Sequence, residues 1–284
     1  MVRLADLAEL VRAPAALTVP GDVLAGAAAA GDRRIGRAGG LAASSVCIYW
    51  AGMALNDWAD RHVDAVERPE RPIPSGRISS RTAIATASAL TAAGLCLAAW
   101  AGRGPAFRTS TMLAATAWSY DLGGKNTPAG PALMAAARGL DVLVGAGARR
   151  RAAWAPALAV GLHTYGVTAM SRGEVHGGTP LPARGALAAT SVITGGTAAG
   201  ARGRSGLVVA ALTALFAGSV APPQVGAARE PTAARMRTAV GAGIHGMVPL
   251  QAAWCARNGA PTTGAALALA LPIARLLARK VSPT

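Results

Sequence analysis

Apolar stretches of about 17 to 20 residues recur along the whole chain, separated by short connections that hold most of the charged residues. A helix of that length crosses a hydrocarbon layer of about 30 Å. Two of the stretches are short, and Pro249 and Pro272 fall inside the last two, so the pattern allows nine or ten spans. The predicted spans lie near residues 14–30, 38–56, 82–101, 106–121, 131–148, 153–170, 186–201, 206–221, 237–256 and 262–278.

The composition indicates that lipid is the solvent of these helices. Hydrophobic residues make up 52% of the 284 residues and charged residues only 14%, against about a quarter in soluble domains. The stretches are rich in Ala, Gly, Ser and Thr, which lets helices pack closely through small side chains. We therefore predict an all-α fold, a polytopic membrane helical bundle that forms one transmembrane domain over residues 1–284.

The N-terminal residues predict an amphipathic helix at the membrane surface ahead of the first span. Four apolar residues share one face of this helix: Leu4, Leu7, Leu10 and Val11. Asp6, Glu9 and Asp22 interrupt the apolar sequence, which is not the pattern of a cleaved signal peptide. The first span is therefore expected to be retained.

The net charge of +15 is spread over the short connections rather than gathered in one patch. Cations at the ends of spans are a membrane pattern, because they contact anionic headgroups or an anionic substrate, so nucleic acid is not an expected partner. Cys47, Cys96 and Cys255 lie far apart within apolar stretches and show no metal-ligand spacing. They are interpreted as small buried hydrophobic residues.

Two polar connections are unusually long, residues 57–81 and residues 171–185. Both follow even-numbered spans, so they emerge on the same side of the membrane. That side collects slightly more Lys and Arg than the other, which favours a cytoplasmic position. We expect a multi-pass protein of the cell membrane whose long connections face the cytoplasm.

The first long connection begins with a concentration of acidic residues. Five of the 13 Asp and Glu residues fall between Asp57 and Glu70. If the second helix continues past Asn56, then Asp57, Asp60 and Asp64 occupy positions i, i+3 and i+7 on one helical face. Carboxylates stacked in this way repel one another unless a hard cation lies between them, and Mg²⁺ prefers such oxygen ligands together with phosphate oxygens. The pattern predicts binding of a Mg²⁺-bound phosphate ester.

Basic residues in the same connection support this interpretation. Guanidinium groups match phosphate oxygens bidentately. Four arginines lie within reach: Arg61, Arg68, Arg71 and Arg77. The alternative is a solvated connection in which arginines and aspartates only neutralise one another. The spacing and the position at the end of a membrane helix favour a binding site.

The stretch NDWADRHVDAVERPERPIPSGRIS at residues 56–79 resembles the first signature of the UbiA superfamily of intramembrane prenyltransferases. That signature is an Asn-Asp-x-x-Asp-x-x-x-Asp run followed by Arg-Pro and a Pro-Ser-Gly-Arg-Ile turn. The resemblance extends over most of the chain and includes YDLGGKNTPAGP and AARGLDVLVGA between residues 120 and 147. It implies nine helices around a central cavity that opens laterally to lipid, with two acidic motifs that hold two Mg²⁺ ions and a prenyl diphosphate.

The resemblance also implies roles for individual residues. Four of them would form the first metal-binding group, the aspartates acting in catalysis and the amide also binding substrate: Asn56, Asp57, Asp60 and Asp64. Three basic residues would bind the diphosphate: Arg68, Arg71 and Lys125.

The second acidic motif departs from the family pattern. Members usually carry Asp-x-x-x-Asp after the sixth span, whereas this chain has SRGEVHGGTP at residues 171–180 with Glu174 as the only carboxylate. Glu174 is the candidate ligand of a second Mg²⁺ and a candidate catalytic residue, and Arg172 is a substrate-binding substitute for metal charge. His176 is interpreted either as a supporting group or general base, or as an ordinary surface residue. These residues place the chain in a branch with an altered second motif.

Arg138 and Asp141 lie within the fifth predicted span at positions i and i+3. Ionisable residues inside a membrane are costly and usually face a cavity or a partner. We expect Arg138 either to bind substrate or to pair with Asp141 as a structural ion pair. Tyr120 and Asn126 are expected at the mouth of the same cavity.

The predicted function is Mg²⁺-dependent ionisation of an allylic prenyl diphosphate and transfer of its prenyl group to an aromatic or other small acceptor. Five aromatic residues are candidates for stabilising the carbocation: Tyr49, Trp50, Trp58, Trp118 and Tyr165. The alternative is a UbiA-type membrane terpene cyclase, which needs no acceptor. An ion transporter is disfavoured because the acids lie at a helix end among arginines. A CDP-alcohol phosphotransferase is disfavoured because its Asp-Gly-x-x-Ala-Arg run is absent.

Overall fold

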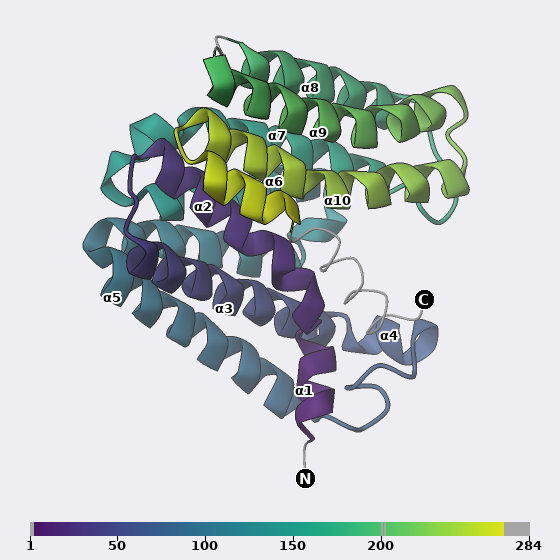
Figure 1. Ribbon diagram of the computed structural model, residues 1–284. Helices are drawn as coiled ribbons and strands as arrows, with labels where there is room; N and C mark the ends of the chain where they lie inside the picture. Colours follow the sequence, from purple (N-terminus) through teal and green to yellow (C-terminus); the bar gives the residue numbers. More distant parts are fainter. Residues whose placement is uncertain (1–2, 200, 202, 270–284) are drawn as a thin grey trace.

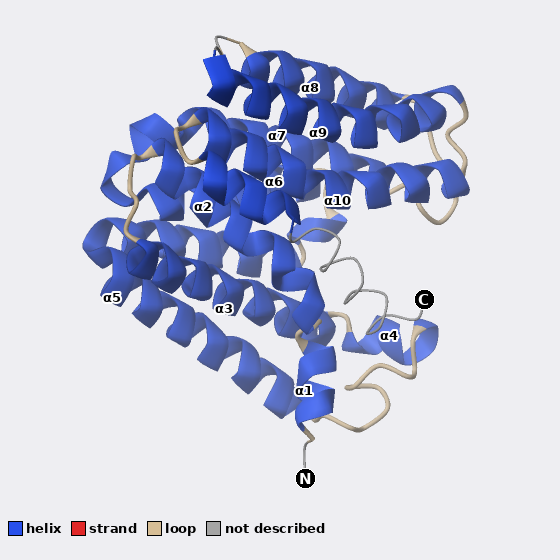
Figure 2. Ribbon diagram, viewed as in Figure 1, coloured by secondary structure: helices blue, strands red, loops and turns tan. Residues whose placement is uncertain are grey.

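The computed structural model describes residues 3–199, 201 and 203–269, and these residues form ten α-helices and no strand (Figure 1, Figure 2). The predicted all-α fold is therefore confirmed. The helices are α1 Leu4–Leu10, α2 Val19–Ala29, α3 Ile35–Ala59, α4 Arg61–Glu67, α5 Ser80–Asp121, α6 Gly130–Ala146, α7 Trp154–Ser171, α8 Leu181–Ala198, α9 Gly203–Arg229 and α10 Ala233–Arg257. Short 3₁₀ segments lie at Ala13–Thr18, Gly124–Asn126 and Gly147–Ala153.

Four helical segments of the described chain are long and apolar enough to cross a membrane: Ile35–Ala59, Ser80–Asp121, Gly130–Ser171 and Ser205–Arg229. Two of them contain 42 residues, which would extend about 63 Å if straight, twice the thickness of a hydrocarbon layer. Each of these two therefore supplies two crossing lengths. The count of nine or ten spans stays a prediction, and part of the last predicted span, 262–278, lies outside the described residues.

Helix α5 is a hairpin of two helical halves. Arg103 interrupts it with a φ of 57°, in the left-handed region, and Pro105 follows two residues later. The indole nitrogen Nε1 of Trp118 donates a hydrogen bond to Oγ1 of Thr91 at 3.1 Å, so the two halves run antiparallel beside each other. The predicted spans 82–101 and 106–121 correspond to these halves.

Helices α2 and α6 cross with their backbones in direct contact. A Cβ atom on Gly26 would lie 1.8 Å from the carbonyl oxygen of Val142, and one on Gly145 would lie 2.0 Å from that of Val23. Only glycine fits at either position. This crossing fixes the distance between α2 and α6.

The crossing brings Asp22 of α2 against Arg138 of α6, with 2.9 Å between Oδ2 and Nη2. Of the two alternatives for Arg138, the ion pair with Asp141 is therefore wrong, because a fully buried carboxylate from another helix pairs with the guanidinium. Asp141 instead accepts a hydrogen bond from the hydroxyl of Ser45 on α3. Gln251 of α10 donates to Asp22 Oδ1 at 2.7 Å and so ties a third helix to the pair.

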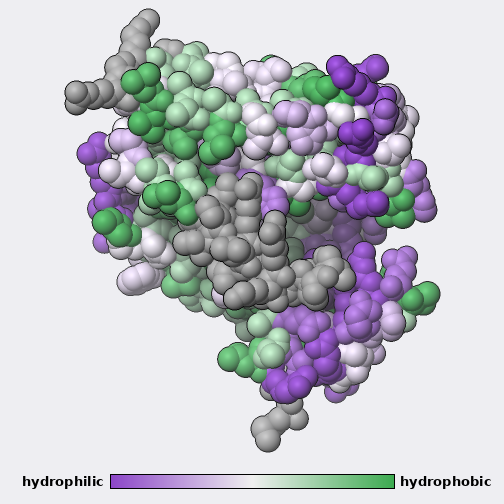
Figure 3. Space-filling view, turned by 45° about the vertical axis from the view of Figure 1, so that its right-hand side comes forward, coloured by the Kyte–Doolittle hydropathy of each residue, from purple (hydrophilic) through white to green (hydrophobic). Residues whose placement is uncertain are grey.

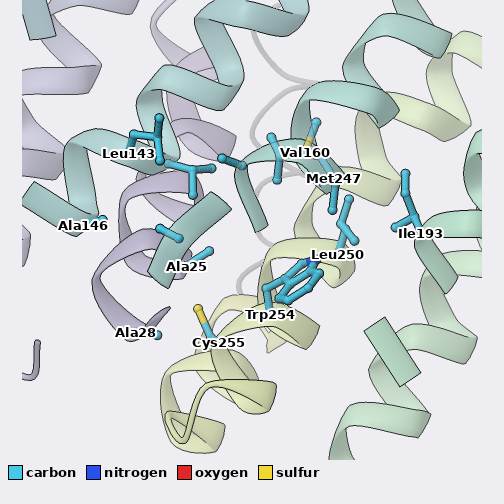
Figure 4. Close-up of a cluster of buried hydrophobic side chains, with 14 of the residues drawn as sticks. Ala25, Ala28, Leu143, Ala146, Val160, Ile193, Met247, Leu250, Trp254 and Cys255 are labelled. Carbon is cyan, nitrogen blue, oxygen red and sulfur yellow. The ribbon is translucent and has the colours of Figure 1, made fainter. Parts of the chain in front are cut away.

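The largest buried cluster joins α2, α6, α7 and α10 (Figure 4). Val160, Leu250 and Trp254 are among the buried side chains at its centre, and Cys255 lies with them. The expectation of a buried cysteine is thus confirmed for Cys255 but wrong for Cys96, which is exposed on α5.

Helix α1 forms where the amphipathic pattern predicts, but only part of the predicted apolar face is buried. Leu10 and Val11 are buried in a cluster with Ile78, whereas Leu4 is 82% exposed. Arg77 makes ion pairs with Asp6 and Glu9, so α1 is also clamped to the end of the long connection before α5.

Candidate active site

The acidic run lies where α3 ends and α4 begins. The helix stops at Ala59, and Asp60 adopts a turn conformation between the two helices. Main-chain hydrogen bonds from Asp60 N to Asn56 O and from Asp64 N to Asp60 O continue the helical repeat across this break. Asp57 and Asp64 therefore remain on one side, where both lie within 3.3 Å of Nη1 of Arg71.

Asp60 faces a different neighbour. Its Oδ2 lies 2.6 Å from Nζ of Lys125, in the 3₁₀ segment that follows α5. Four residues earlier on each chain segment, Nδ2 of Asn56 donates to Oδ1 of Asp121 at 3.1 Å. Two side-chain contacts therefore join the ends of α3 and α5, and the predicted basic residue Lys125 lies at the acidic run.

Asp121 is a buried carboxylate of this site that the sequence analysis missed. A signal was present, because Asp121 stands next to Tyr120 and four residues before Lys125, at the end of a predicted span.

Arg12 is the second missed residue. It lies in the connection between α1 and α2, and its Nη2 is 2.7 Å from Oδ1 of Asp57. Its backbone φ of 45° places it in the left-handed region, where the chain turns away from α1. Nothing in its sequence neighbourhood distinguishes Arg12 from an arginine at the headgroup level.

The remaining arginines of the connection between α3 and α5 contact different neighbours. Arg68 lies at the site, 3.8 Å from Asp64, with about half of its side chain exposed. Arg61 stacks over the ring of Trp58 at 4.7 Å and donates to that residue's carbonyl. Because Arg77 binds α1 and Arg61 binds Trp58, these two predicted arginines are engaged elsewhere, whereas Arg12 and Arg71 both lie against Asp57.

A cavity of about 240 Å³ opens beside the acidic run between α3, α5 and α6. Its walls are largely apolar and contain two aromatic rings, those of Tyr49 and Tyr120. Its other lining residues are Arg12, Val19, Ser45, Ile48, Gly52, Met53, Asn56, Leu113, Ala117, Asp121, Met134, Ala137, Arg138 and Asp141. The charged mouth at the helix ends thus leads into a chamber inside the bundle.

The deep end of this cavity is polar. Ser45 lies eleven residues before Asn56 on α3, which is about 16 Å along the helix. Arg138 and Asp141 line the cavity from α6. Nε and Nη2 of Arg138 are buried and make no hydrogen bond within the described chain, because the contact with Asp22 has the distance of an ion pair but not the angle of a hydrogen bond. These donors can bind a polar group of a ligand.

The aromatic candidates are only partly placed at the cavity. Tyr49 lines it, as does the predicted mouth residue Tyr120. Trp50, Trp58 and Trp118 instead pack against the cluster beneath α1, and Tyr165 lines an apolar groove between α6 and α7. The expectation for these four rings is wrong, because their helix faces point away from the chamber.

The altered second motif follows α7. The guanidinium of Arg172 donates to the carbonyl of Thr127, in the loop that carries Lys125, so Arg172 reaches the side of the mouth. Glu174 makes no ion pair with any residue in the described ranges, and its main-chain oxygen accepts a hydrogen bond from Arg237. Partial burial raises the pKa of Glu174, and the positive charge of Arg237 opposes that rise. His176 is exposed on the same loop.

The carboxylates at the mouth of the cavity offer oxygen ligands, which hard cations such as Mg²⁺ prefer. Within the described ranges no three His, Cys, Asp or Glu side chains converge on one point. Asp57 and Asp64 nevertheless both lie within 3.3 Å of one cationic nitrogen, Nη1 of Arg71, so the two carboxylates face the same positive charge. The amide of Asn56 and the carboxylate of Asp121 add further oxygen donors nearby, of the kind that Mg²⁺ prefers.

The surface distribution agrees with a bundle whose two ends are polar. Figure 3 shows hydrophilic side chains gathered toward opposite edges of the view, with a mostly pale or hydrophobic surface between them. The acidic run and the 3₁₀ segment with Lys125 belong to one end of the bundle, and the start of α3 belongs to the other.

Comparison with known proteins identifies relatives over short stretches. A digeranylgeranylglyceryl phosphate synthase of Methanothrix thermoacetophila is 60% identical over 51 residues, which cover 18% of this chain and 19% of that protein. The chloroplastic chlorophyll synthase of Oryza sativa subsp. japonica is 44% identical over 91 residues, 28% of this chain and 24% of that protein. The matched stretches thus span about a fifth to a quarter of these curated relatives.

The fold has solved counterparts. The apo structure of a UbiA homolog from Aeropyrum pernix K1 has a TM-score of 0.66 at 21% identity and covers 81% of this chain and 94% of its own. A structure described for digeranylgeranylglyceryl phosphate synthase in membranes has a TM-score of 0.63 at 17% identity, covering 92% and 100%. The model of the UbiA prenyltransferase family matches residues 17–224, which is most of the chain. The chain therefore belongs to the UbiA prenyltransferase family.

Proposed function

We propose that this protein is an intramembrane prenyltransferase that uses Mg²⁺ to ionise an allylic prenyl diphosphate and transfers the prenyl group to a small acceptor. The observation that carries the proposal is the juxtaposition of Asp57, Asp60 and Asp64 with Arg12, Arg71 and Lys125 at the mouth of an apolar chamber. Carboxylates of this kind hold metal ions, and the cations beside them match a diphosphate.

The side chains of the mouth would bind and orient the diphosphate. Arg12 and Arg71 present guanidinium groups, and Lys125 adds an ammonium group from the opposite helix end. These fixed positive charges stabilise the negative charge that develops on the leaving diphosphate. Asn56, Asp57, Asp60 and Asp64 would hold Mg²⁺, which when bound supplies further positive charge to the leaving group. Arg68 lies at the edge of the same group.

The walls of the chamber would protect the cation that forms. Ile48, Leu113 and Met134 exclude water, and the rings of Tyr49 and Tyr120 offer π faces to positive charge. The allylic carbon would thus lie just inside the mouth, with the prenyl chain directed into or along the apolar walls.

The polar deep end supports a transfer to an acceptor. The unpaired donors of Arg138 and the neighbouring Asp141 and Ser45 offer hydrogen bonds to a hydroxyl, carboxyl or carbonyl group. Buried polar groups are costly unless they are hydrogen-bonded, and an acceptor bound here would supply partners for the donors of Arg138. Two of the relatives are named digeranylgeranylglyceryl phosphate synthase and chlorophyll synthase, and these names refer to different products. The identity of the acceptor therefore needs a direct test.

Glu174 and Arg172 are proposed to assist from the altered second motif. Arg172 already contacts the loop of Lys125, and it would add a guanidinium to the diphosphate site. Glu174 would bind a second Mg²⁺ after a movement of its loop. We further propose that this end of the bundle faces the cytoplasm of the cell, where soluble diphosphates are available.

The test is incubation of the purified protein and Mg²⁺ with allylic diphosphates of several chain lengths, with and without aromatic or hydroxylated acceptors. We expect a prenylated product only when both substrates are present. Asp60→Ala should lower turnover by about two to three orders of magnitude and leave the protein folded in detergent. Undiminished turnover in Asp60→Ala would contradict the metal assignment, and a cyclised product formed without acceptor would show the cyclase instead.

A further inference from the structure

A second cavity, of about 570 Å³, lies at the end of the bundle opposite the acidic run. The loop between α2 and α3, the bend of α5 and the end of α6 enclose it, and the first two of these lie at the left of Figure 1, away from α4. Five arginines line it: Arg33, Arg34, Arg37, Arg103 and Arg149. Asp32 is the only carboxylate among its lining residues. We call this space the arginine cavity.

The single carboxylate neutralises only part of this charge. Oδ2 of Asp32 lies 2.7 Å from Nη2 of Arg34 and 2.8 Å from Nη1 of Arg37. The hydrogen bonds from Arg34 hold the pKa of Asp32 well below its usual range, so the carboxylate is ionised. Five positive groups against one negative group leave four positive charges around one cavity.

Three of the arginines donate hydrogen bonds to backbone oxygens, and the exposed Arg33 does so to the carbonyl of Gly259 at 3.4 Å. Nη1 of Arg37 donates to the carbonyl of Gly145 at 3.3 Å, and Nη1 of Arg149 donates to that of Ala30 at 3.0 Å. Arg37 is largely buried, at 13% exposure, and a Cβ on Gly147 would lie 2.1 Å from its Nη2. A guanidinium group has five N–H donors, so each of these side chains keeps donors for a ligand.

Arg103 lines the cavity from the bend of α5. Its backbone takes up the left-handed conformation that turns the hairpin, a position at which an arginine is unusual. It makes no hydrogen bond or ion pair with any residue in the described ranges. The strained position therefore brings a cation without an ion-pair partner in the described chain to a cavity lined by four other arginines.

We propose that the arginine cavity binds a phosphate group of the kind carried by an anionic phospholipid. Guanidinium forks match phosphate oxygens, and an anion relieves the repulsion among the arginines. The cavity lies at an end of the bundle, and the neighbouring Trp100 and Ile35 are 75% and 88% exposed, as suits side chains in contact with lipid. Helix α3, about 37 Å long, separates the cavity from the acidic run, so this site is independent of the proposed transfer reaction.

The test compares two sources of phosphate. In one arm the purified full-length protein is placed in phosphatidylcholine nanodiscs with increasing phosphatidylglycerol, and retained lipid is measured by native mass spectrometry. In the other arm inorganic phosphate is titrated into protein in uncharged detergent with EDTA present, which suppresses metal-dependent binding at the acidic run. The variant R33Q/R103Q removes two cavity charges without touching Asp32, and R108Q/R151Q removes two charges from the same end outside the cavity.

We expect R33Q/R103Q to weaken binding by about tenfold or more and R108Q/R151Q by less than about twofold. If R33Q/R103Q loses binding only in the nanodiscs, the ligand is a lipid headgroup. If it loses binding of inorganic phosphate, the ligand is a soluble phosphate. Either result supports the site. Equal losses in both variants, or no binding in either arm, would overturn it. If R33Q/R103Q does not fold, R33Q and R151Q, both at exposed positions, give the same comparison. Prenyl transfer should be unchanged in all of these variants, which separates this proposal from the proposed function.

Discussion

Nη2 of Arg12 lies 2.7 Å from Oδ1 of Asp57, although 45 residues separate them. The contact makes the connection between α1 and α2 part of the mouth of the cavity, which Arg12 also lines. The N-terminal segment therefore completes the candidate active site rather than only anchoring the chain at the membrane surface.

Replacing Arg12 tests this contact. Arg12→Gln should lower kcat/KM for the diphosphate by about a hundredfold, because it removes a fixed positive charge from the leaving group. Steady-state kinetics with a prenyl diphosphate measures this loss. Arg81→Gln, an exposed arginine on the same side of the bundle, is the matched control and should have little effect. Equal kinetics in the two variants would remove Arg12 from the site.

Asp121 is predicted to support metal binding. Asp121→Asn keeps the shape of the side chain but removes a negative charge next to Asn56. The Mg²⁺ concentration needed for half-maximal activity should rise by about tenfold. Asp32→Asn, at the opposite end of the bundle, should leave this concentration unchanged. An unaltered Mg²⁺ dependence in Asp121→Asn would limit Asp121 to positioning α3 against α5.

Replacing only one partner of the ion pair between Asp22 and Arg138 should destabilise the folded protein. Arg138→Met leaves a buried carboxylate without its cation and should lower the free energy of unfolding by about 3–5 kcal/mol. The double variant Asp22→Asn with Arg138→Met removes both charges and should recover much of this loss. Unfolding in detergent followed by tryptophan fluorescence provides the measurement. Additive losses in the double variant would mean that the two groups do not interact.

The contact between α2 and α6 depends on glycine. Gly145→Ala places a methyl group against the carbonyl oxygen of Val23 and should destabilise the protein by about 3 kcal/mol, since neither backbone can move freely. Gly185→Ala on α8, where no atom lies within 4 Å of the added methyl group, is the control. That control should be neutral or slightly stabilising, because alanine favours helix. Equal unfolding temperatures would show that the helices can separate without cost.

The attachment of α1 should depend on pH. Hydrogen bonds from Arg3 and then Arg77 lower the pKa of Asp6 from 3.8 to about 2. A carboxyl group whose pKa is lowered by folding stabilises the folded state above its unfolded pKa and loses that contribution as the pH falls toward 2. The difference in unfolding temperature between the natural protein and Asp6→Asn should be present at pH 6 and shrink between pH 4 and 2. Glu67→Gln, at an exposed position without an ion pair to a described residue, should show no such trend.

The sequence predicted the features that depend on the spacing of nearby residues along the chain. Apolar periodicity located the helices, and the spacing of Asp57, Asp60 and Asp64 located the acidic run. Lys125 was found because a family resemblance gave it a role. The sequence did not predict the break at Asp60, because the helical repeat continues through it in hydrogen bonding and only the backbone angles change.

The features that were missed depend on which helices become neighbours. Asp22 pairs with Arg138 because the close crossing of α2 and α6 brings the two side chains together. Arg12 reaches Asp57 through a turn whose left-handed residue has no sequence signal. These ion pairs form between different segments of the chain. The spacing of residues along one helix does not predict which other segment packs against it.

The close backbone contacts of Gly26 with Val142 and of Gly145 with Val23 also limit how this protein can diverge. Neither glycine accepts a side chain, so the backbone distance between α2 and α6 cannot be changed by a substitution at these two positions. Selection for a longer or shorter prenyl chain would then act on side chains that line the chamber, at positions such as Ile48 on α3 and Leu113 on α5. Substrate range in close relatives should vary with these two positions while the glycine pair stays constant.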